Sequence, residues 1–239
     1  MKQTIVYSSE PVTLLGGGAA LTRDVEMALA LAPTCVAADG GAELARAAGV
    51  ALDALIGDFD SVAPDTLALT PPERRHRISE QDSTDFDKAL RHIAAPVVVC
   101  VGFLGARLDH QLGALHVLVR RADRPCVLLG ESEVAFLCPP TLRIGTVRDD
   151  VVSLFPMGAV TGTSSGLRWA IDGLQFHPMT QIGTSNAAEG AITLTMDQPA
   201  MIVMLPRIYL SEVTQALACA PPSARWTARA ERYIDRTRS

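Results

Sequence analysis

The chain has 239 residues, of which 48% are hydrophobic and 20% are charged, and its formal net charge at pH 7 is −5. This composition supports a sizeable folded core and excludes an intrinsically disordered chain. The acidic balance gives no electrostatic footprint for a nucleic acid partner. We therefore expect one large or two small globular domains that do not bind nucleic acid.

The five cysteines are widely spaced, include no Cys-x-x-Cys pair and are odd in number. This usage favours free thiols in a reducing compartment. The first residues lack a basic region followed by an uninterrupted apolar core, so no secretory signal is indicated. Apolar runs such as residues 97–104 are much shorter than a membrane span. The expectation is a cytoplasmic protein without membrane contact.

In chain order, the first part alternates short apolar runs with helical patterns. Strands are expected at residues 12–15, 35–38 and 51–56, and helices at residues 21–31 and 42–48. Such alternation is typical of an α/β domain with a mostly parallel sheet, similar to a Rossmann fold.

A glycine-rich turn, Gly16-Gly17-Gly18, follows the first of these strands. The turn resembles the start of a dinucleotide-binding motif, but Leu21 stands where that fingerprint needs a small residue. We favour a turn that only allows the helix to pack on its strand.

Carboxylates stand at the ends of the next two predicted strands, at Asp39 and then at Asp58 and Asp60. In an extended segment Asp58 and Asp60 point the same way. At about 4 Å, two carboxylates repel by roughly 4 kcal/mol at an effective dielectric constant near 20. Such a pair therefore favours a bound proton or cation, and Mg²⁺ is the cation that accompanies phosphates. The alternative is that both aspartates only cap a turn.

A second acidic cluster follows an irregular, proline-rich stretch at residues 62–78, whose arginines we assign no role. Asp82-Ser83-Thr84-Asp85 has the residue types that begin a helix, which is expected to reach about Ala94. Acids in a first turn also stabilise the helix dipole, which is a purely structural alternative. The crowding of acids beside Lys88, however, also suits a phosphate site at a helix N-terminus.

The β-branched run at residues 97–101 is typical of a strand buried on both faces. It leads into the glycine-containing loop 102–106, then Arg107, Asp109 and a helix. Strand, loop, arginine and helix start together predict a phosphate cradle.

Beyond a strand at residues 126–129 the pattern changes. Short strand-like runs at residues 151–155, 191–196 and 201–205 predict a small all-β domain that begins near residue 138 and ends at residue 220. In the tail, residues 221–239, arginines at helical spacing predict a short solvated helix, with partner or membrane contact as the alternative. These arginines are Arg225, Arg229, Arg232 and Arg236.

Several motifs, in this order and spacing, resemble the thiamine pyrophosphokinase family. The N-terminal motifs are Asp39-Gly40-Gly41-Ala42, Gly57-Asp58-Phe59-Asp60-Ser61, Asp82-Ser83-Thr84-Asp85-Phe86-Asp87-Lys88-Ala89-Leu90 and Arg107-Leu108-Asp109-His110. The C-terminal motifs are Ser165-Gly166-Leu167-Arg168-Trp169 and Thr184-Ser185-Asn186. Each motif alone is common, but the ordered set is specific.

The resemblance implies transfer of pyrophosphate from ATP to the hydroxyl of thiamine, giving thiamine diphosphate and AMP. It also implies an N-terminal α/β domain at residues 1–138, a C-terminal β-sandwich at residues 139–220 that binds thiamine and forms a homodimer, and an active site near the subunit interface.

The resemblance further implies the roles of individual residues. Three acids would be catalytic and hold Mg²⁺: Asp58, Asp60 and Asp85. Six residues would lie on the ATP side: Asp39, Gln81, Thr84, Lys88, Arg107 and Asp109. Three residues would bind thiamine: Ser185, Asn186 and, by stacking, Trp169. The chain departs from the family at Gly105-Ala106, where a glycine pair is usual.

The implied chemistry also agrees with the residues themselves. In-line displacement at phosphorus needs neutralised charge and a positioned nucleophile more than covalent help. Two other functions stay open. A nucleotide-dependent oxidoreductase would use the Gly16 turn but leave the aspartates without a role, and a non-catalytic thiamine or nucleotide sensor would bind without turnover.

Overall fold

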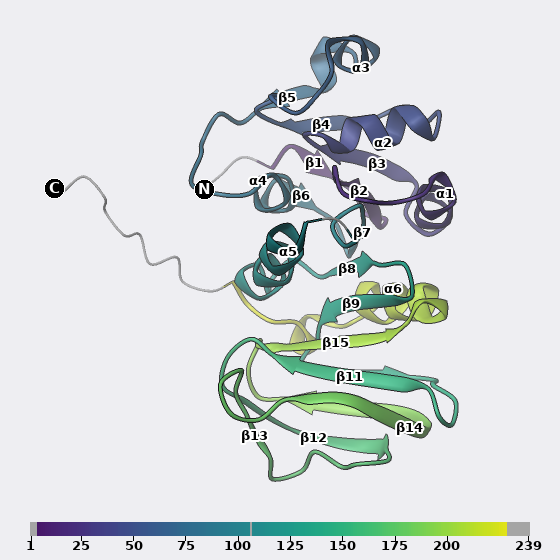
Figure 1. Ribbon diagram of the computed structural model, residues 1–239, viewed down its shortest axis with the longest axis vertical. Helices are drawn as coiled ribbons and strands as arrows, with labels where there is room; N and C mark the ends of the chain where they lie inside the picture. Colours follow the sequence, from purple (N-terminus) through teal and green to yellow (C-terminus); the bar gives the residue numbers. More distant parts are fainter. Residues whose placement is uncertain (1–3, 106, 229–239) are drawn as a thin grey trace, which may run out of the picture.

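Figure 1 shows a computed structural model in which helices surround the strands of the first half of the chain, while strands predominate in the second half. The structure describes residues 4–105 and 107–228. Most strands belong to one ten-stranded mixed sheet, and β3, β4 and β5 form a three-stranded sheet beside β2. The protein therefore has an α/β fold built on a large mixed sheet.

The strands of the N-terminal part pair in parallel. β2 (Val12–Leu15) pairs with β7 (Val98–Val101), and β7 pairs with β8 (Cys126–Leu129). β3 (Thr34–Ala38), β4 (Ala54–Gly57) and β5 (Arg75–Arg77) pair in parallel in their turn. β2, β4, β7 and β8 are buried along their whole length, which explains why their sequences are continuous apolar runs.

Helices cover both faces of these strands. α1 (Thr22–Leu31) and α2 (Gly41–Ala47) pack into one apolar core, and α4 (Asp85–Arg91) and α5 (Leu108–Arg120) pack into another. Successive strand residues alternate between the two cores, as the side-chain repeat of a strand requires.

Two predicted segments differ from the structure in this part. The stretch 62–78 is not irregular throughout, because it contains α3 (Pro64–Leu69), a 3-10 turn and β5. α4 ends at Arg91 rather than near Ala94. The chain then forms the short strand β6 (Ile93–Ala94), which pairs with β1 (Val6–Tyr7).

Antiparallel strands extend the sheet in the C-terminal part. β9 (Glu133–Leu137) pairs with both β8 and β15 (Met201–Pro206). The long strand β14 (Gly183–Met196) pairs through its first half with β11 (Val151–Pro156). Its second half pairs with β10 (Thr141–Ile144), and it also pairs with β12 (Val160–Leu167), whose neighbour is β13 (Gln175–Phe176). β14 thus joins two groups of strands.

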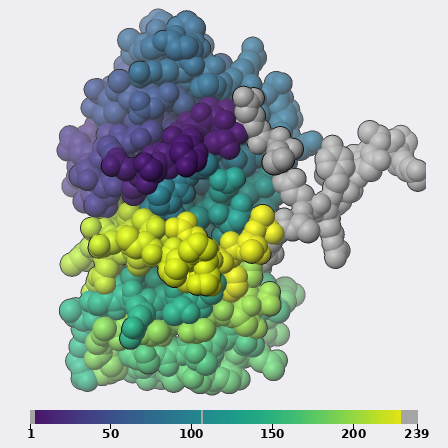
Figure 2. Space-filling view, turned by 180° about the vertical axis from the view of Figure 1, so that it is seen from behind, coloured from purple at the N-terminus to yellow at the C-terminus, as the bar shows by residue number. Residues whose placement is uncertain are grey.

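The C-terminal part is not all-β, since it contains helix α6 (Leu210–Ala218). Leu210, Val213 and Leu217 are buried at helical spacing, and α6 contacts β8 and β10. In Figure 2, seen from behind, α6 and the segment after it form the yellow band between the purple N-terminal part and the green strands. The described residues include no helix long and apolar enough to cross a membrane.

The tail also differs from the predicted solvated helix where the structure describes it. Residues Pro222–Ala224 form a single 3-10 turn. Arg225 donates to the main-chain oxygens of Leu217, Ala218, Ala220 and Pro96. Arg225 is therefore bound to the body of the protein. Arg229, Arg232 and Arg236 lie outside the described residues.

Candidate active site

A cleft of about 690 Å³ opens where β2, β3 and β7 end. Its position agrees with the general rule that ligands bind at the carboxyl ends of parallel strands. Five of the predicted site residues line it: Asp39, Thr84, Asp85, Arg107 and Asp109. Thr84 and Arg107 stand at the N-terminal ends of α4 and α5, so two helix starts face the same space.

Close backbone contacts shape the floor of the cleft. A Cβ atom at Gly41 would lie 2.1 Å from the carbonyl oxygen of Leu15, so only glycine allows α2 to begin this close to β2. Gly102, directly after β7, has a φ of +80°, which favours glycine. The Gly16 turn likewise lines the cleft, where we had expected only a packing role.

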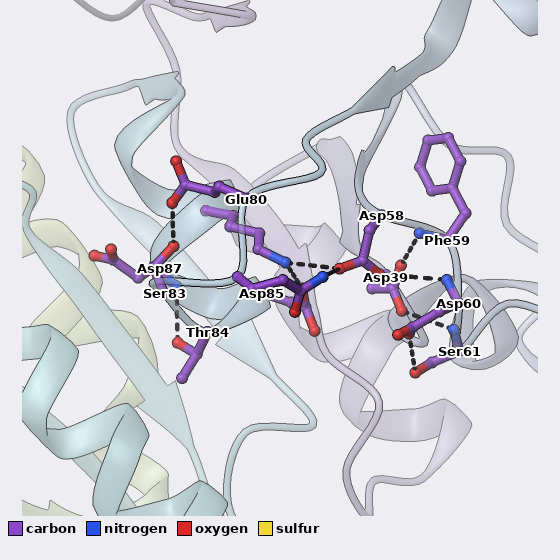
Figure 3. Close-up of polar contacts among 12 residues, drawn as sticks. Asp39, Asp58, Phe59, Asp60, Ser61, Glu80, Ser83, Thr84, Asp85 and Asp87 are labelled. Carbon is purple, nitrogen blue, oxygen red and sulfur yellow. Dashed lines mark hydrogen bonds and ion pairs between the residues drawn. The ribbon is translucent and has the colours of Figure 1, made fainter. Parts of the chain in front are cut away.

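Asp39 is buried and organises the loop that follows β4. Its Oδ1 accepts from the N–H of Phe59 at 2.6 Å and its Oδ2 accepts from the N–H of Ser61 at 3.1 Å. Burial raises the pKa of Asp39, and the nearby charges of Asp85 and Asp58 act in the same direction. Asp39 thus fixes the backbone on both sides of Asp60 (Figure 3).

Asp58 and Asp85 share the ammonium group of Lys88. Lys88 Nζ lies 2.9 Å from Asp58 Oδ2 and 2.9 Å from Asp85 Oδ1, and the Lys88 side chain is only 3% exposed. The hydrogen bond from Lys88 holds the pKa of Asp58 below its usual range, and Gln81 adds a hydrogen bond of 3.2 Å to the same Oδ2. Asp58 is therefore ionised near neutral pH.

Three carboxylates lie close enough to share one cation. Oxygen atoms of Asp39, Asp58 and Asp60 all lie within 4.8 Å of one another. Asp60 is exposed and its Oδ1 accepts from the hydroxyl of Ser61 at 2.9 Å. Hard oxygen donors of this kind fit Mg²⁺. Asp85, which the resemblance places in the metal set, pairs with Lys88 as Asp58 does, and its part in the metal set stays a prediction.

Arg107 and Asp109 form an exposed pair at the rim of the cleft. Arg107 Nε donates to Asp109 Oδ1 at 3.1 Å, and Arg107 Nη2 donates to Asp109 Oδ2 at 2.6 Å. This hydrogen bonding lowers the pKa of Asp109. The neighbouring Ala106, which replaces the family's second glycine, lies outside the described residues.

Sequence analysis missed an aromatic pair in the cleft. The rings of Phe86 and Phe103 are tilted, with centroids 4.4 Å apart. Phe103 lies two residues after the end of β7, and that position beside a strand end was a signal for it. Other lining residues without an earlier role are Glu43, Ser61, His110 and Gln111.

The three residues expected to bind thiamine lie elsewhere in the chain and do not line the cleft. Ser185 and Asn186 are on β14, and Trp169 follows β12, in the lower part of Figure 1. Ser185 has a φ of 62°, and its N–H donates to Ser153 Oγ at 3.0 Å. Trp169 is 57% exposed. The chain therefore presents a cleft of about 690 Å³ and, outside its lining, an exposed tryptophan.

Two family models match the chain. The model for the thiamin pyrophosphokinase catalytic domain matches residues 25–128, and the model for the thiamin pyrophosphokinase vitamin B1 binding domain matches residues 141–201. The first match contains the cleft residues from Ala38 onward but not the Gly16 turn, and the second contains Trp169, Ser185 and Asn186.

Curated relatives from plants are similar over part of their length. Thiamine pyrophosphokinase 2 of Arabidopsis thaliana is 31% identical over 165 residues, which are 61% of this chain and 62% of the relative. Thiamine pyrophosphokinase 1 of Oryza sativa subsp. japonica is 30% identical over 159 residues, 57% of this chain and 59% of the relative. The matched part thus spans less than two thirds of these relatives.

Solved structures share the fold. The thiamin pyrophosphokinase from Candida albicans superposes with a TM-score of 0.69 at 14% identity, covering 86% of this chain and 94% of that one. The thiamin pyrophosphokinase from Geobacillus thermodenitrificans gives a TM-score of 0.66 at 23% identity, covering 82% and 96%.

Proposed function

Since the chain belongs to the thiamin pyrophosphokinase family, we propose that it transfers pyrophosphate from ATP to the hydroxyl of thiamine and releases AMP. The observation that carries this proposal is the carboxylate cluster of Asp39, Asp58 and Asp60 beside Lys88, of which Asp39 lines the cleft. Carboxylates repel phosphates unless cations intervene, so this arrangement suits a metal-bound triphosphate.

The reaction makes one bond and breaks one. The thiamine hydroxyl oxygen attacks the β-phosphorus of ATP, the bond from that phosphorus to the oxygen bridging to the α-phosphorus breaks, and AMP leaves. The hydroxyl proton passes to a carboxylate of the cluster or to solvent. Asp58, held ionised by Lys88, is suited to an electrostatic or ligand role.

The ATP side of the site comprises Asp39, Gln81, Thr84, Lys88, Arg107 and Asp109. The helix starts at Thr84 and Arg107 offer backbone N–H groups to phosphate oxygens. Arg107 adds a guanidinium that matches phosphate geometry. Asp39 supports this side indirectly, through the loop that it holds.

Magnesium is the cation that the oxygen donors favour, and Asp58 and Asp60 would hold it, with Asp85 or Asp39 completing the set. When bound, it neutralises phosphate charge and orients the leaving group. Lys88 pairs with both Asp58 and Asp85 and so keeps these carboxylates in fixed positions.

The thiamine side is proposed to comprise Trp169, Ser185 and Asn186 on the C-terminal β-sandwich, residues 139–220. The Rossmann-like catalytic domain, residues 1–138, would carry the cleft. Because the two sets lie apart in one chain, we propose a homodimer in which a second copy brings the thiamine surface to the cleft. We also propose a cytoplasmic location, which the free cysteines support.

The decisive experiment incubates the purified protein with ATP, Mg²⁺ and thiamine and measures AMP and thiamine diphosphate together, with thiamine-free and EDTA controls. We expect equimolar products that disappear with EDTA. AMP without thiamine diphosphate would indicate a different acceptor. Binding of thiamine with neither product would favour a sensor and contradict the proposal.

A further inference from the structure

The side chain of Asn186 is buried and bonded to the main chain of Trp169. Its Nδ2 donates to the carbonyl oxygen of Trp169 at 2.7 Å. Its Oδ1 accepts from the N–H of Trp169 at 3.2 Å and from the N–H of Ala187 at 2.8 Å. An amide side chain has two donor hydrogens and an oxygen with two lone pairs. Both acceptor positions and one donor of Asn186 are therefore used within the protein, and the residue is only 7% exposed.

Trp169 itself lies just beyond the end of β12, where no strand pairing fixes its backbone. The two hydrogen bonds between the Asn186 side chain and the main chain of Trp169 replace that pairing. The indole ring is further oriented by Arg168, whose guanidinium carbon lies 5.8 Å from the ring centroid. Arg168 is in turn held by Glu189 at 2.9 Å and by Asp149. The ring thus has a defined orientation although more than half of the residue is exposed.

We infer that Asn186 is a positioning residue that sets the orientation of Trp169, rather than a residue that contacts thiamine. This inference rests on the proposed function in one respect, namely that the Trp169 ring receives the cationic ring of thiamine. Attraction between a cation and an aromatic face needs the cation within about 6 Å of the ring centroid, over the face. Loss of the Asn186 hydrogen bonds therefore weakens thiamine binding through Trp169 and leaves the ATP cleft unchanged.

The test uses protein labelled with 5-fluorotryptophan. The chain has two tryptophans, so the ¹⁹F spectrum has two signals, which a Trp169→Phe variant assigns. In Asn186→Ala we expect the Trp169 signal to shift and narrow, because the ring gains motion, while the Trp226 signal stays in place as an internal reference. Thr195→Ala, at an exposed position on the same strand, is the matched control and should move neither signal.

Steady-state kinetics supply the second readout. We expect Asn186→Ala to raise the KM for thiamine about tenfold, the equivalent of roughly 1.4 kcal/mol of lost cation–π attraction, with the KM for ATP unchanged. A raised thiamine KM with an unchanged Trp169 signal would overturn the inference in favour of direct contact. If Asn186→Ala lowered the melting temperature but changed neither the Trp169 signal nor the KM for thiamine, Asn186 would have only a structural role. That result would also overturn the inference.

A second variant covers the case in which Asn186→Ala does not fold. Asn186→Asp keeps the acceptor oxygen but replaces the donor with an oxygen that repels the carbonyl of Trp169. Its Trp169 signal should also shift, and an unchanged signal would contradict the inference. The ¹⁹F spectra do not depend on turnover. A failure of the proposed reaction would appear in the wild-type product assay, whereas a failure of the inference on Asn186 would appear in the spectra, so the two are distinguishable.

Discussion

At the scale of single residues, the site depends on how buried charges are compensated. Lys88 has little access to solvent, and burial alone would lower its pKa. Its hydrogen bonds to Asp58 and Asp85 outweigh that effect and raise it. The same contacts lower the pKa of Asp58. Asp58 and Lys88 therefore hold each other in the ionised form.

Replacing Lys88 should shift the acid side of the pH profile. In Lys88→Met the hydrogen bond that lowers the pKa of Asp58 is lost, so this pKa rises and Asp58 becomes protonated at a higher pH. Activity that needs ionised Asp58 should then be lost earlier as the pH falls, which the pH dependence of kcat/KM measures. The matched control, Arg23→Met, removes an exposed cation. An acid limb at the wild-type position would contradict the role given to Lys88.

Asp60 tests the metal assignment because it is exposed and makes few contacts. Asp60→Ala should lower kcat about a hundredfold or more, since removing a Mg²⁺ ligand costs several kcal/mol of transition-state stabilisation. The melting temperature should change little. Asp65→Ala, an exposed acid at the start of α3, serves as the control. If Asp60→Ala kept half the wild-type rate, the assignment would be wrong.

At the scale of elements, α4 and α5 are joined by a buried ionic cluster. Asp87 of α4 has a side chain that is only 1% exposed, and Arg121, at the end of α5, donates to it at 2.6 and 3.0 Å. Arg120 and Arg91 lie at 3.8 and 4.0 Å. Burial would raise the pKa of Asp87, but the hydrogen bonds and charge of Arg121 outweigh it and hold the pKa below its usual range.

Removal of this carboxylate should destabilise the protein. Asp87→Ala removes a buried carboxylate that pairs with Arg121, Arg120 and Arg91. Breaking a buried ion pair typically costs about 3–5 kcal/mol in the free energy of unfolding. Because the folded-state pKa is lowered, the stabilisation is fully present above the ordinary aspartate pKa and is lost as the pH falls through the lowered value. Urea denaturation should therefore show a smaller difference in the free energy of unfolding between Asp87→Ala and the wild type at acidic pH than at neutral pH.

Asp123→Ala is the matched control, since Asp123 is more exposed and pairs with Arg124 at 3.4 Å. Its effect should stay below about 1 kcal/mol. Equal losses in both variants, or a loss in Asp87→Ala that does not depend on pH, would contradict the argument.

Elements with a simple residue pattern could be predicted from the sequence, and others could not. The buried strands β2, β7 and β8 appear as apolar runs, and Thr84 marks the start of α4 by accepting from the N–H of Asp87. β12 was missed because its middle consists of glycine, serine and threonine, with buried apolar residues only at its two ends. α6 was not predicted although its apolar spacing is present, because it is short and closely follows the apolar run of β15.

The same distinction holds for the candidate site. Asp39, Thr84 and Arg107 could be assigned to one site because they stand at strand ends and helix starts, and local sequence patterns specify both kinds of position. The partners of individual carboxylates depend on tertiary packing, so the sequence did not indicate that Asp85 would face Lys88 or that Asp39 would hold Phe59 and Ser61. Nor did it indicate that Asn186 would bind the backbone of Trp169.

At the scale of the whole molecule, contacts between distant segments connect the two parts of the chain. Arg207, directly after β15, donates to Asp24 of α1 at 2.6 Å and to the carbonyl oxygen of Gly130 at 3.0 Å. On the other side, Trp226 Nε1 donates to the carbonyl oxygen of Cys138 at 2.8 Å. The C-terminal segment is therefore part of the junction between the cleft-bearing part and the antiparallel strands.

Arg225 is the central residue of this junction. It binds the last carbonyl oxygens of α6 and also that of Pro96, which precedes β7. A cation is favourable at a helix C-terminus, and hydrogen bonds from a charged group are stronger than neutral ones.

Arg225→Ala should lower the free energy of unfolding by about 3 kcal/mol, measured by urea denaturation. The KM values at low temperature should stay unchanged, because Arg225 does not line the cleft. Arg77→Ala, an exposed arginine on β5, is the control and should be close to neutral. If Arg225→Ala lost no more stability than the control, Arg225 would contribute nothing to the junction, as expected for the solvated tail that the sequence predicted.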